Sequence, residues 1–234
     1  MQARVLLLLV FSAILFSGCV NVEYYHQFNS DGSSMIIQKT DLSGLIEIEN
    51  QSSLSDQVSS VCQNITEPVK CSYEGNTITL SRQMKPDEGS YSFKKAIDFP
   101  YAIYTLEIKH LPAILDPNTP AGSLESGSTP YSDFEDPSAT SAASAIKAAG
   151  ANITYIVEMP GKIIDHNGEL TTESPSGKEA VRFDIAQMMS EGKRPMVVSK
   201  EMDLILIAIV VFTIAIALGI VAAIIIFLKT RPSQ

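Results

Sequence analysis

The sequence predicts an α+β fold: an antiparallel sheet with one main helix packed on it, followed by a single C-terminal transmembrane helix. Three observations lead to this expectation. Short alternating segments flank turn residues in 20–40, apolar residues recur at helical spacing in 42–61, and 204–228 carries no charge. A period of two indicates a strand, whereas a spacing of three or four residues indicates a helix.

The uncharged run 204–228 is the most informative segment. At about 1.5 Å per residue, a helix of this length exceeds the roughly 30 Å hydrocarbon core of a bilayer. Lys229 and Arg231 follow the run, and cationic flanks stay on the cytoplasmic side. We therefore expect a transmembrane helix at 204–228, a cytoplasmic tail at 229–234, and the preceding chain outside the cell membrane.

The N-terminal residues predict the same orientation. Arg4 precedes an apolar segment, 5–16, of a length typical of a secretion signal. The following Phe16-Ser17-Gly18-Cys19 resembles a lipobox, in which the cysteine is lipidated and becomes the first residue of the mature chain. We expect a signal peptide with lipobox at 1–18 and a lipid on Cys19. The alternative is ordinary signal cleavage nearby, with Cys19 a plain thiol.

The chain has three cysteines, and an odd number outside the cell leaves one over. Cys62 and Cys71 bracket a short turn-like stretch. Pairing them closes a small loop and stabilises the fold by roughly 2–3 kcal/mol. We predict this disulfide, which leaves Cys19 as the cysteine that a lipid would modify.

Three Asn-x-Ser/Thr sequons provide candidate glycosylation sites at Asn50, Asn64 and Asn152. Outside the cell such sequons accept glycans. The alternative is chance, because a polar chain of this length produces one or two.

The elements before the proline-rich part follow from local signals. Ser30-Asp31-Gly32-Ser33 and Glu74-Gly75-Asn76 are hairpin turn signals. Asp41 is a candidate N-cap for the helix at 42–61. The strands predicted around these features are 20–29, 34–40, 69–73, 77–82, 90–95 and 101–110. Together they make 19–111 the first part of the extracytoplasmic domain.

The segment 112–137 contains five prolines among glycine, serine and acidic residues, and this composition predicts a disordered insertion. A short helix at 138–149, ended by Gly150, is expected to follow. Asn167-Gly168 is a further hairpin signal, and the remaining predicted strands are 152–159, 162–165 and 180–185. We expect 138–186 to complete the domain and 187–203 to be a juxtamembrane linker.

The net charge and the motifs that are absent limit the classes of function that the sequence supports. The segment 19–203 carries all 26 acidic residues and 14 of the 17 basic ones, a net charge of −12, which argues against nucleic-acid binding. The sequence contains no Gly-x-Ser-x-Gly, no glycine-rich phosphate loop and no Cys-x-x-Cys. His26, His110 and His166 lie far apart along the chain. We expect no catalytic residues, no metal site and no cofactor.

An acidic cluster lies near the end of the proline-rich segment. Asp133, Glu135 and Asp136 stand beside Tyr131 and Phe134. We expect a solvated stretch here. The alternatives are a Ca²⁺ site, although the spacing lacks the glycine and distal glutamate of a known calcium loop, and a short docking motif built on the two aromatic residues.

Several short motifs occur in a recognisable order. Gly18-Cys19-Val20 leads into a strand and the 30–33 turn. Met159-Pro160-Gly161-Lys162, Asn167-Gly168, a last strand at 181–185 and one terminal transmembrane helix follow. The arrangement resembles the LppM-type lipoprotein domain family of bacterial and archaeal envelopes. Members lack a known catalytic motif, so the resemblance implies an envelope location and an α+β fold rather than a reaction. The insertion 112–137 departs from this pattern.

The leading hypothesis is a non-enzymatic binding or structural module of the cell envelope, fixed to the bilayer. A groove between the helix at 42–61 and the sheet would suit a lipid or envelope glycolipid. The alternative is an accessory subunit of a membrane complex, contacted through the small residues Ala215, Gly219 and Ala223 on one helix face. An envelope enzyme built from distant acidic residues is the third hypothesis.

Overall fold

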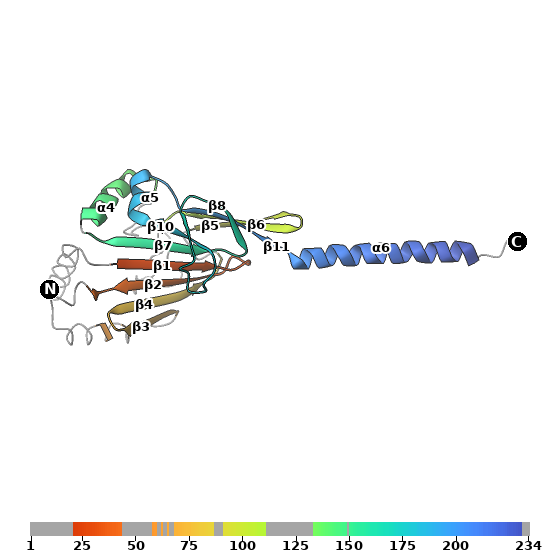
Figure 1. Cartoon of the computed structure of the whole chain (residues 1–234), viewed down its shortest axis with the longest axis horizontal. Helices are drawn as coiled ribbons and strands as arrows, with labels where there is room; N and C mark the ends of the chain where they lie inside the picture. The colour runs from red at the N-terminus through yellow and green to blue at the C-terminus, as the bar shows by residue number, and fades with distance from the viewer. Residues whose placement is uncertain are drawn as a thin grey trace.

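The structure, a computed structural model, describes residues 21–43, 58–59, 62, 65, 68–86, 91–110, 133–148 and 150–230. It confirms the predicted α+β class. Two β-sheets and two packed helices form a folded domain, and a long apolar helix extends away from one end of it (Figure 1).

The larger sheet has seven strands in the order β3-β4-β2-β1-β7-β10-β9. Its strands are β1 (Asn21–Phe28), β2 (Ser34–Asp41), β3 (Val69–Glu74), β4 (Thr77–Met84), β7 (Asn152–Glu158), β9 (Glu169–Thr171) and β10 (Ala180–Asp184). The predicted hairpins β1–β2 and β3–β4 are present with continuous antiparallel registers. Gly32 has φ +84° in the first turn, a backbone conformation that glycine adopts readily.

The smaller sheet has four strands in the order β5-β6-β11-β8. Its strands are β5 (Tyr91–Asp98), β6 (Tyr101–Ile108), β8 (Lys162–His166) and β11 (Met196–Met202). Every second residue of β6 is buried, as expected for a strand with one face on a core. The hairpin turn between β5 and β6 contains a cis peptide bond between Phe99 and Pro100.

The prediction of a single antiparallel sheet is corrected in two respects. The strands divide into two sheets, and β7 pairs with β1 in parallel, with Tyr155 beside Tyr24. A parallel neighbour requires a long connection. Here the chain from β2 to β7 passes through the smaller sheet before it returns to β1.

The hairpin expected at Asn167-Gly168 is also corrected. The strands on either side of it, β8 and β9, belong to different sheets, so the chain crosses from one sheet to the other at this point. Asn167 instead accepts a hydrogen bond from the Met196 backbone at 2.8 Å and donates one to the Arg194 carbonyl at 2.8 Å. Its side chain thereby holds the start of β11.

The juxtamembrane linker expected at 187–203 is largely structured. It contains most of helix α5 (Ile185–Glu191) and the whole of β11. In β11 the buried residues Val197 and Ser199 alternate with less buried ones. Over so few residues, such alternation is a weak indication of a strand. β11 forms by pairing with β6 and β8, and both of these strands are distant from it in the sequence.

Helix α4 (Pro137–Ala148) confirms the helix predicted at 138–149, and Gly150 follows it with φ +64°. It packs against α5. Asp184 caps the N-terminus of α5 by accepting a hydrogen bond from the Gln187 backbone at 2.9 Å. Both helices contribute side chains, including Ala139 and Met188, to the common core.

The core lies between the two sheets. Phe28 of β1 stacks on Phe93 of β5 with ring centroids 5.6 Å apart, and Phe93 lies 5.7 Å from Tyr104 of β6. Tyr155 and Leu106, one from each sheet, are both fully buried. This aromatic contact between the sheets makes them one domain.

Several predicted features lie outside the described residues. They are the signal peptide at 1–18, Cys19, most of the helix predicted at 42–61, Asn50, Asn64 and the insertion up to residue 132.

Candidate functional site

The region that stands out for function is the junction between the folded domain and helix α6 (Leu204–Thr230). The segment Leu204–Ile224 is strongly apolar and none of it is buried within the structure. Large side chains such as Phe212 and Leu218 point into open space, with 68% and 65% of their surface exposed. A soluble domain buries such side chains. α6 is therefore a helix that could span a membrane.

The start of α6 is fixed to the domain through Asp203. This carboxylate accepts a hydrogen bond from the Leu206 backbone at 3.0 Å and so caps the helix. The backbone N–H of Asp203 donates to the Pro100 carbonyl at 3.1 Å. Lys95 lies 3.8 Å from the same carboxylate. The helix thus begins in direct contact with the turn of the β5–β6 hairpin.

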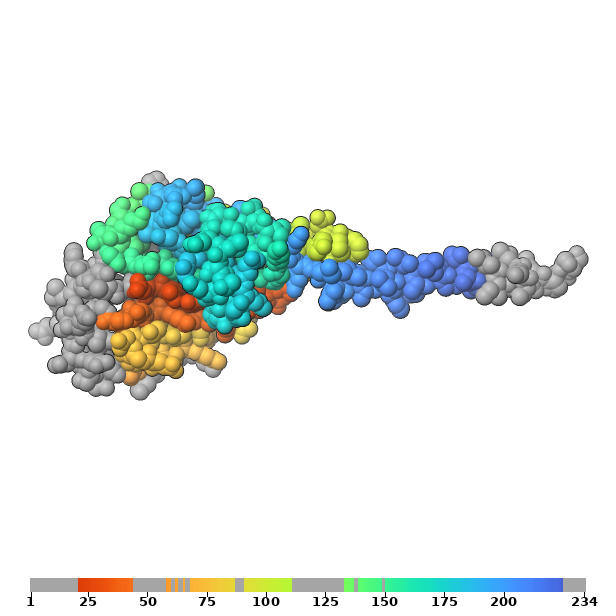
Figure 2. Space-filling view, in the orientation of Figure 1, coloured from red at the N-terminus to blue at the C-terminus, as the bar shows by residue number. Residues whose placement is uncertain are grey.

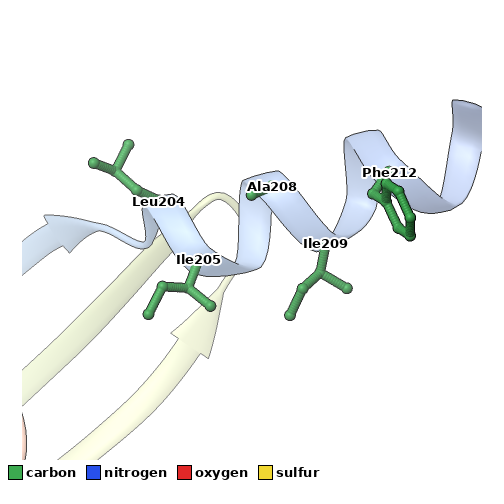
Figure 3. Close-up of a pocket in the computed structure, with 5 residues that line it drawn as sticks. All are labelled: Leu204, Ile205, Ala208, Ile209 and Phe212. Carbon is green, nitrogen blue, oxygen red and sulfur yellow. The ribbon is translucent and has the colours of Figure 1, made fainter.

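The hairpin end itself is unusually apolar and exposed. Ile97 is 60% and Phe99 57% exposed, and Met202 of the adjoining β11 is 50% exposed. The hairpin extends from the domain alongside the first turns of α6 (Figure 2). Leu204, Ile205, Ala208, Ile209 and Phe212 line a shallow apolar hollow on these turns, beside the hairpin (Figure 3).

Basic and aromatic side chains surround this junction. The Lys200 ammonium lies 5.2 Å from the centre of the Tyr101 ring, and the Lys95 ammonium lies 5.7 Å from that of Tyr104. Burial and the nearby Glu201 carboxylate raise the pKa of Tyr104. Lysine and tyrosine side chains are typical of the boundary between a membrane and water.

A buried polar network surrounds His26 in the core. Its Nδ1 is hydrogen-bonded to the Tyr155 hydroxyl, and its Nε2 lies 2.8 Å from Ser34 Oγ. Burial lowers the pKa of His26 to about 3 and raises the pKa of Tyr155. A serine beside a histidine is the arrangement of a nucleophile and its base. Because Ser34 and His26 are at most 1% exposed, the pair cannot meet a substrate and we assign it a structural role.

Sequence reasoning missed this network because His26, Ser34 and Tyr155 lie on three different strands. The alternation of β1 places His26 on the same face as Tyr24 and Phe28, which was the only available signal. The other two histidines lie elsewhere. His166 Nδ1 is 2.9 Å from the Gly168 carbonyl oxygen, and His110 follows β6. Within the described ranges, no group of three or more His, Cys, Asp and Glu side chains is arranged to hold a metal ion.

The predicted acidic stretch is partly structured, which corrects the expectation of disorder for residues 133–136. The Arg194 guanidinium donates to both carboxylate oxygens of Asp133, at 3.1 and 2.7 Å, and to Glu107 at 2.9 Å. Glu135 lies 3.0 Å from the same guanidinium. Phe134 is 2% exposed and belongs to the core. Neither a calcium site nor a free docking motif fits these contacts.

Arg194 is expected to hold the 133–135 segment against the domain. The hydrogen bonds from its guanidinium lower the pKa of Asp133. Arg194→Gln removes the positive charge and leaves three carboxylates facing one another, so we expect a lower midpoint of thermal unfolding and faster proteolysis near residue 133. Lys193→Gln is the matched control, because the ion pair that Lys193 makes within the described part of the chain is with Glu191, 2.8 Å away on the surface. Equal unfolding midpoints for the two variants would contradict this role.

The carboxylate of Glu158, at the end of β7, is buried and also has structural partners. It accepts hydrogen bonds from Gln27 at 3.1 Å and from Ser176, and Lys178 lies 3.6 Å away. These contacts attach the loop before β10 to the end of the larger sheet. Both oxygens of the carboxylate are engaged in these contacts.

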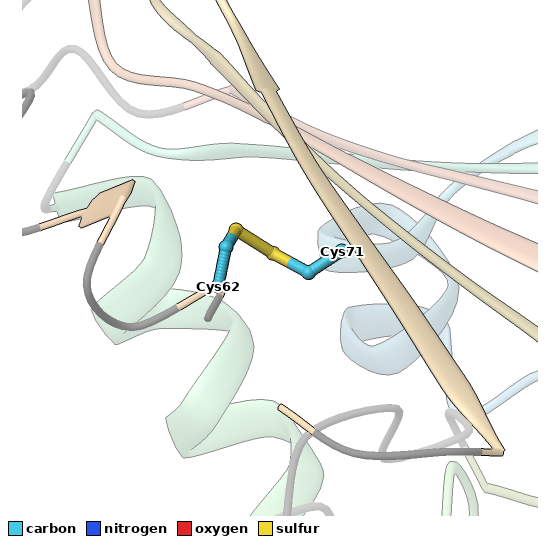
Figure 4. Close-up of a disulfide and its surroundings, with 2 residues drawn as sticks. All are labelled: Cys62 and Cys71. Carbon is cyan, nitrogen blue, oxygen red and sulfur yellow. A yellow bond between two sulfur atoms is a disulfide. The ribbon is translucent and has the colours of Figure 1, made fainter. Parts of the chain in front are cut away.

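The predicted pairing of Cys62 with Cys71 is present in the structure (Figure 4). Their Cα atoms are 5.2 Å apart, a normal separation for a disulfide. The bond joins a helical residue to β3. Asn152, the one described sequon asparagine, has an exposed side chain at the start of β7, so its modification stays a prediction. Ala215, Gly219 and Ala223 lie exposed along α6, and their role in partner contacts also stays a prediction.

No family model and no curated protein matches the chain. Among solved structures, the chain is similar to the NMR structure of the folded domain of LppM from Mycobacterium tuberculosis. The match has 10% identity and a TM-score of 0.32, and covers 79% of this chain and 91% of that chain. Values this low carry no argument about function. The fold and the junction define the class: an α+β domain followed by one apolar helix of membrane-spanning length.

Proposed function

We propose that the chain is a membrane-fixed module of the cell envelope, with its folded domain outside the membrane and the tail after α6 in the cytoplasm. The observation that carries this proposal is α6. It leaves the domain directly from β11, is capped by Asp203, and has none of its apolar segment Leu204–Ile224 buried within the structure. Only a bilayer or a very apolar partner would cover such a surface.

Two further observations support the orientation. Lys229 and Arg231 follow the apolar run, and cationic residues stay on the cytoplasmic side. Cys62 and Cys71 are joined in the folded domain, and disulfides persist mainly in oxidising compartments outside the cytoplasm. A lipid on Cys19 would add a second attachment, although one acyl chain alone anchors only weakly.

Within this setting we propose a binding or structural role rather than catalysis. The polar groups that resemble catalytic ones are committed to the fold. Ser34 and His26 are buried, Glu158 is held by Gln27 and Ser176, and Asp133 is held by Arg194. A lipid or envelope glycolipid is the ligand class that suits a domain held against the bilayer.

The orientation can be tested with single cysteines and a membrane-impermeant maleimide. Thr172 is exposed in the loop after β9, so Thr172→Cys is expected to be labelled in intact cells. Ser233→Cys, in the tail, is expected to be labelled only after permeabilisation. The unaltered chain sets the background from its own cysteines. Labelling of the tail but not of the loop in intact cells would overturn the proposal.

The binding role calls for a separate measurement on the full chain, purified from its own membranes in mild detergent. Native mass spectrometry is expected to show a discrete excess mass that disappears on denaturation, and that mass would identify the ligand class. Absence of any excess mass would contradict lipid or glycolipid binding and leave a structural role.

A further inference from the structure

On the core face of β5, Lys95 separates Phe93 from a second apolar residue, Ile97, near the end of the hairpin. Phe93 of β5 and its partner Leu106 of β6 face the larger sheet and pack in the core. Ile97 lies four residues further along β5 and pairs with Ala102. Because every second residue of a strand points to the same face, Ile97 is on the same face as Phe93. Yet Ile97 is 60% exposed on β5, which is the edge strand of the smaller sheet.

Phe99 extends this exposed surface to the very end of the hairpin. It is 57% exposed in a turn, a position where polar residues or glycine are usual. Met202, which is opposite Tyr101 in the ladder between β6 and β11, is also half exposed. Met202 stands two residues before Leu204, the first residue of α6, and the Asp203 backbone is bonded to Pro100 in the turn, so the exposed side chains of the hairpin end lie next to the start of the helix.

The position of the hairpin end relative to α6 indicates which surroundings would cover its exposed apolar side chains. The hydrogen bond from the Asp203 backbone to Pro100 places the turn level with the first residue of the helix. The helix has 27 residues, about 40 Å at 1.5 Å per residue, which exceeds the roughly 30 Å hydrocarbon core by about 10 Å. This excess leaves room for the first turns of α6, and for the hairpin beside them, in the boundary region between headgroups and acyl chains.

The polar side chains near the start of α6 suit a position at the boundary between headgroups and acyl chains. Lys200 lies over the ring of Tyr101, and Lys95 reaches both Tyr104 and Asp203. Such side chains keep their apolar parts toward hydrocarbon and their charged or hydroxyl ends toward water. Asp98, the one acidic residue of the turn, stands on the opposite face from Ile97 by strand alternation.

We propose that the end of the β5–β6 hairpin, through Ile97 and Phe99, enters the headgroup–acyl boundary of the leaflet that α6 crosses first. The inference rests on the proposal that α6 spans the membrane. The folded domain then has two contacts with the bilayer, one helix and one hairpin, instead of a single flexible attachment. The Asp203–Pro100 and Asp203–Lys95 contacts join the two, so the domain keeps a set orientation over the lipid surface.

The chain contains no tryptophan, so one introduced tryptophan reports its own environment. We would reconstitute the full chain in phosphatidylcholine vesicles whose acyl chains carry bromine near the headgroup end, which quenches tryptophan on contact. Phe99→Trp and Ile97→Trp replace exposed side chains and are expected to lose fluorescence in brominated vesicles relative to unbrominated ones. Using two positions protects the result against a local disturbance at either.

Two controls complete the experiment. Phe212→Trp lies within α6 and is expected to be quenched. Tyr73→Trp lies on β3, on the side of the domain away from α6 (Figure 1), and is expected to be unaffected. If Phe212→Trp is quenched while Phe99→Trp and Ile97→Trp behave like Tyr73→Trp, the hairpin inference is wrong and the hairpin faces water or a protein. If Phe212→Trp is not quenched, the membrane-spanning role of α6 fails as well.

Discussion

Gly161→Ala is expected to destabilise the folded domain by on the order of 3 kcal/mol or more. Gly161 has φ +74°, a conformation that costs other residues about 1–2 kcal/mol. A Cβ at this position would lie 2.3 Å from the Lys200 carbonyl oxygen and 2.7 Å from its carbon. These are backbone atoms of β11, so relief requires a shift of the strand, at a further cost of about 1–3 kcal/mol.

Gly75→Ala is the matched control for this substitution. Gly75 also has a positive φ, +59°, but a Cβ there would meet nothing within 4 Å. It therefore isolates the backbone cost of about 1–2 kcal/mol from the steric one. Denaturant unfolding of the full chain in detergent, followed by the near-ultraviolet circular dichroism of tyrosine, reports the domain alone because α6 has no tyrosine. Equal losses for the two variants would contradict close packing of Gly161 on β11.

The second large effect is a loss of stability in mild acid caused by His26. Burial lowers the pKa of this imidazole to about 3 in the folded chain, whereas an unfolded histidine titrates near 6.5. Below pH 6.5 the unfolded chain therefore binds a proton that the folded chain excludes. Stability is complete above pH 6.5 and falls by about 1.4 kcal/mol per pH unit toward pH 3. We expect a loss of about 2 kcal/mol at pH 5.

His26→Phe tests the assignment. The variant has no titrating group at this position, although it leaves the hydroxyls of Ser34 and Tyr155 without the imidazole. We expect it to be less stable than the unaltered chain at pH 7, with a flatter dependence of unfolding free energy between pH 6.5 and 5. Acidic groups with lowered pKa values, such as Asp31 and Asp133, lose their contribution only at lower pH. If the unfolding free energy of the variant falls with pH between 6.5 and 5 as steeply as that of the unaltered chain, His26 is not the source of the acid sensitivity.

Much of the local structure was predictable. The β1–β2 hairpin follows from alternating residues around Asp31-Gly32, where the Asp31 carboxylate accepts a hydrogen bond from the Ser33 backbone at 2.9 Å. Helix α4 ends at Gly150 as expected, and Cys62 lies within bonding distance of Cys71. Each of these features depends on residues within about ten positions of one another, so neighbouring residues are enough to specify it.

The candidate site was only half predictable. The apolar run of α6 was evident, whereas the hairpin beside it was not singled out. Ile97 and Phe99 fall between the predicted strands 90–95 and 101–110, where nothing in the sequence indicates an exposed apolar hairpin end. Their exposed position depends on the tertiary structure, in which β5 is the edge strand and β6 pairs with β11, about 95 residues later in the chain. The acidic cluster was expected to be solvated because its partner, Arg194, lies 61 residues away.

The sequence by itself determined the α+β class, the hairpins, the disulfide pairing and the long apolar helix, because turn chemistry, side-chain periodicity and a run of uncharged residues act locally. Only the tertiary structure decided that β7 pairs in parallel with β1, that Asn167-Gly168 crosses between sheets, that Phe134 joins the core, and that Ile97 and Phe99 stay exposed beside α6. Those outcomes depend on which distant strands meet, and the free energy of burying residues against them is not expressed in any short stretch of chain.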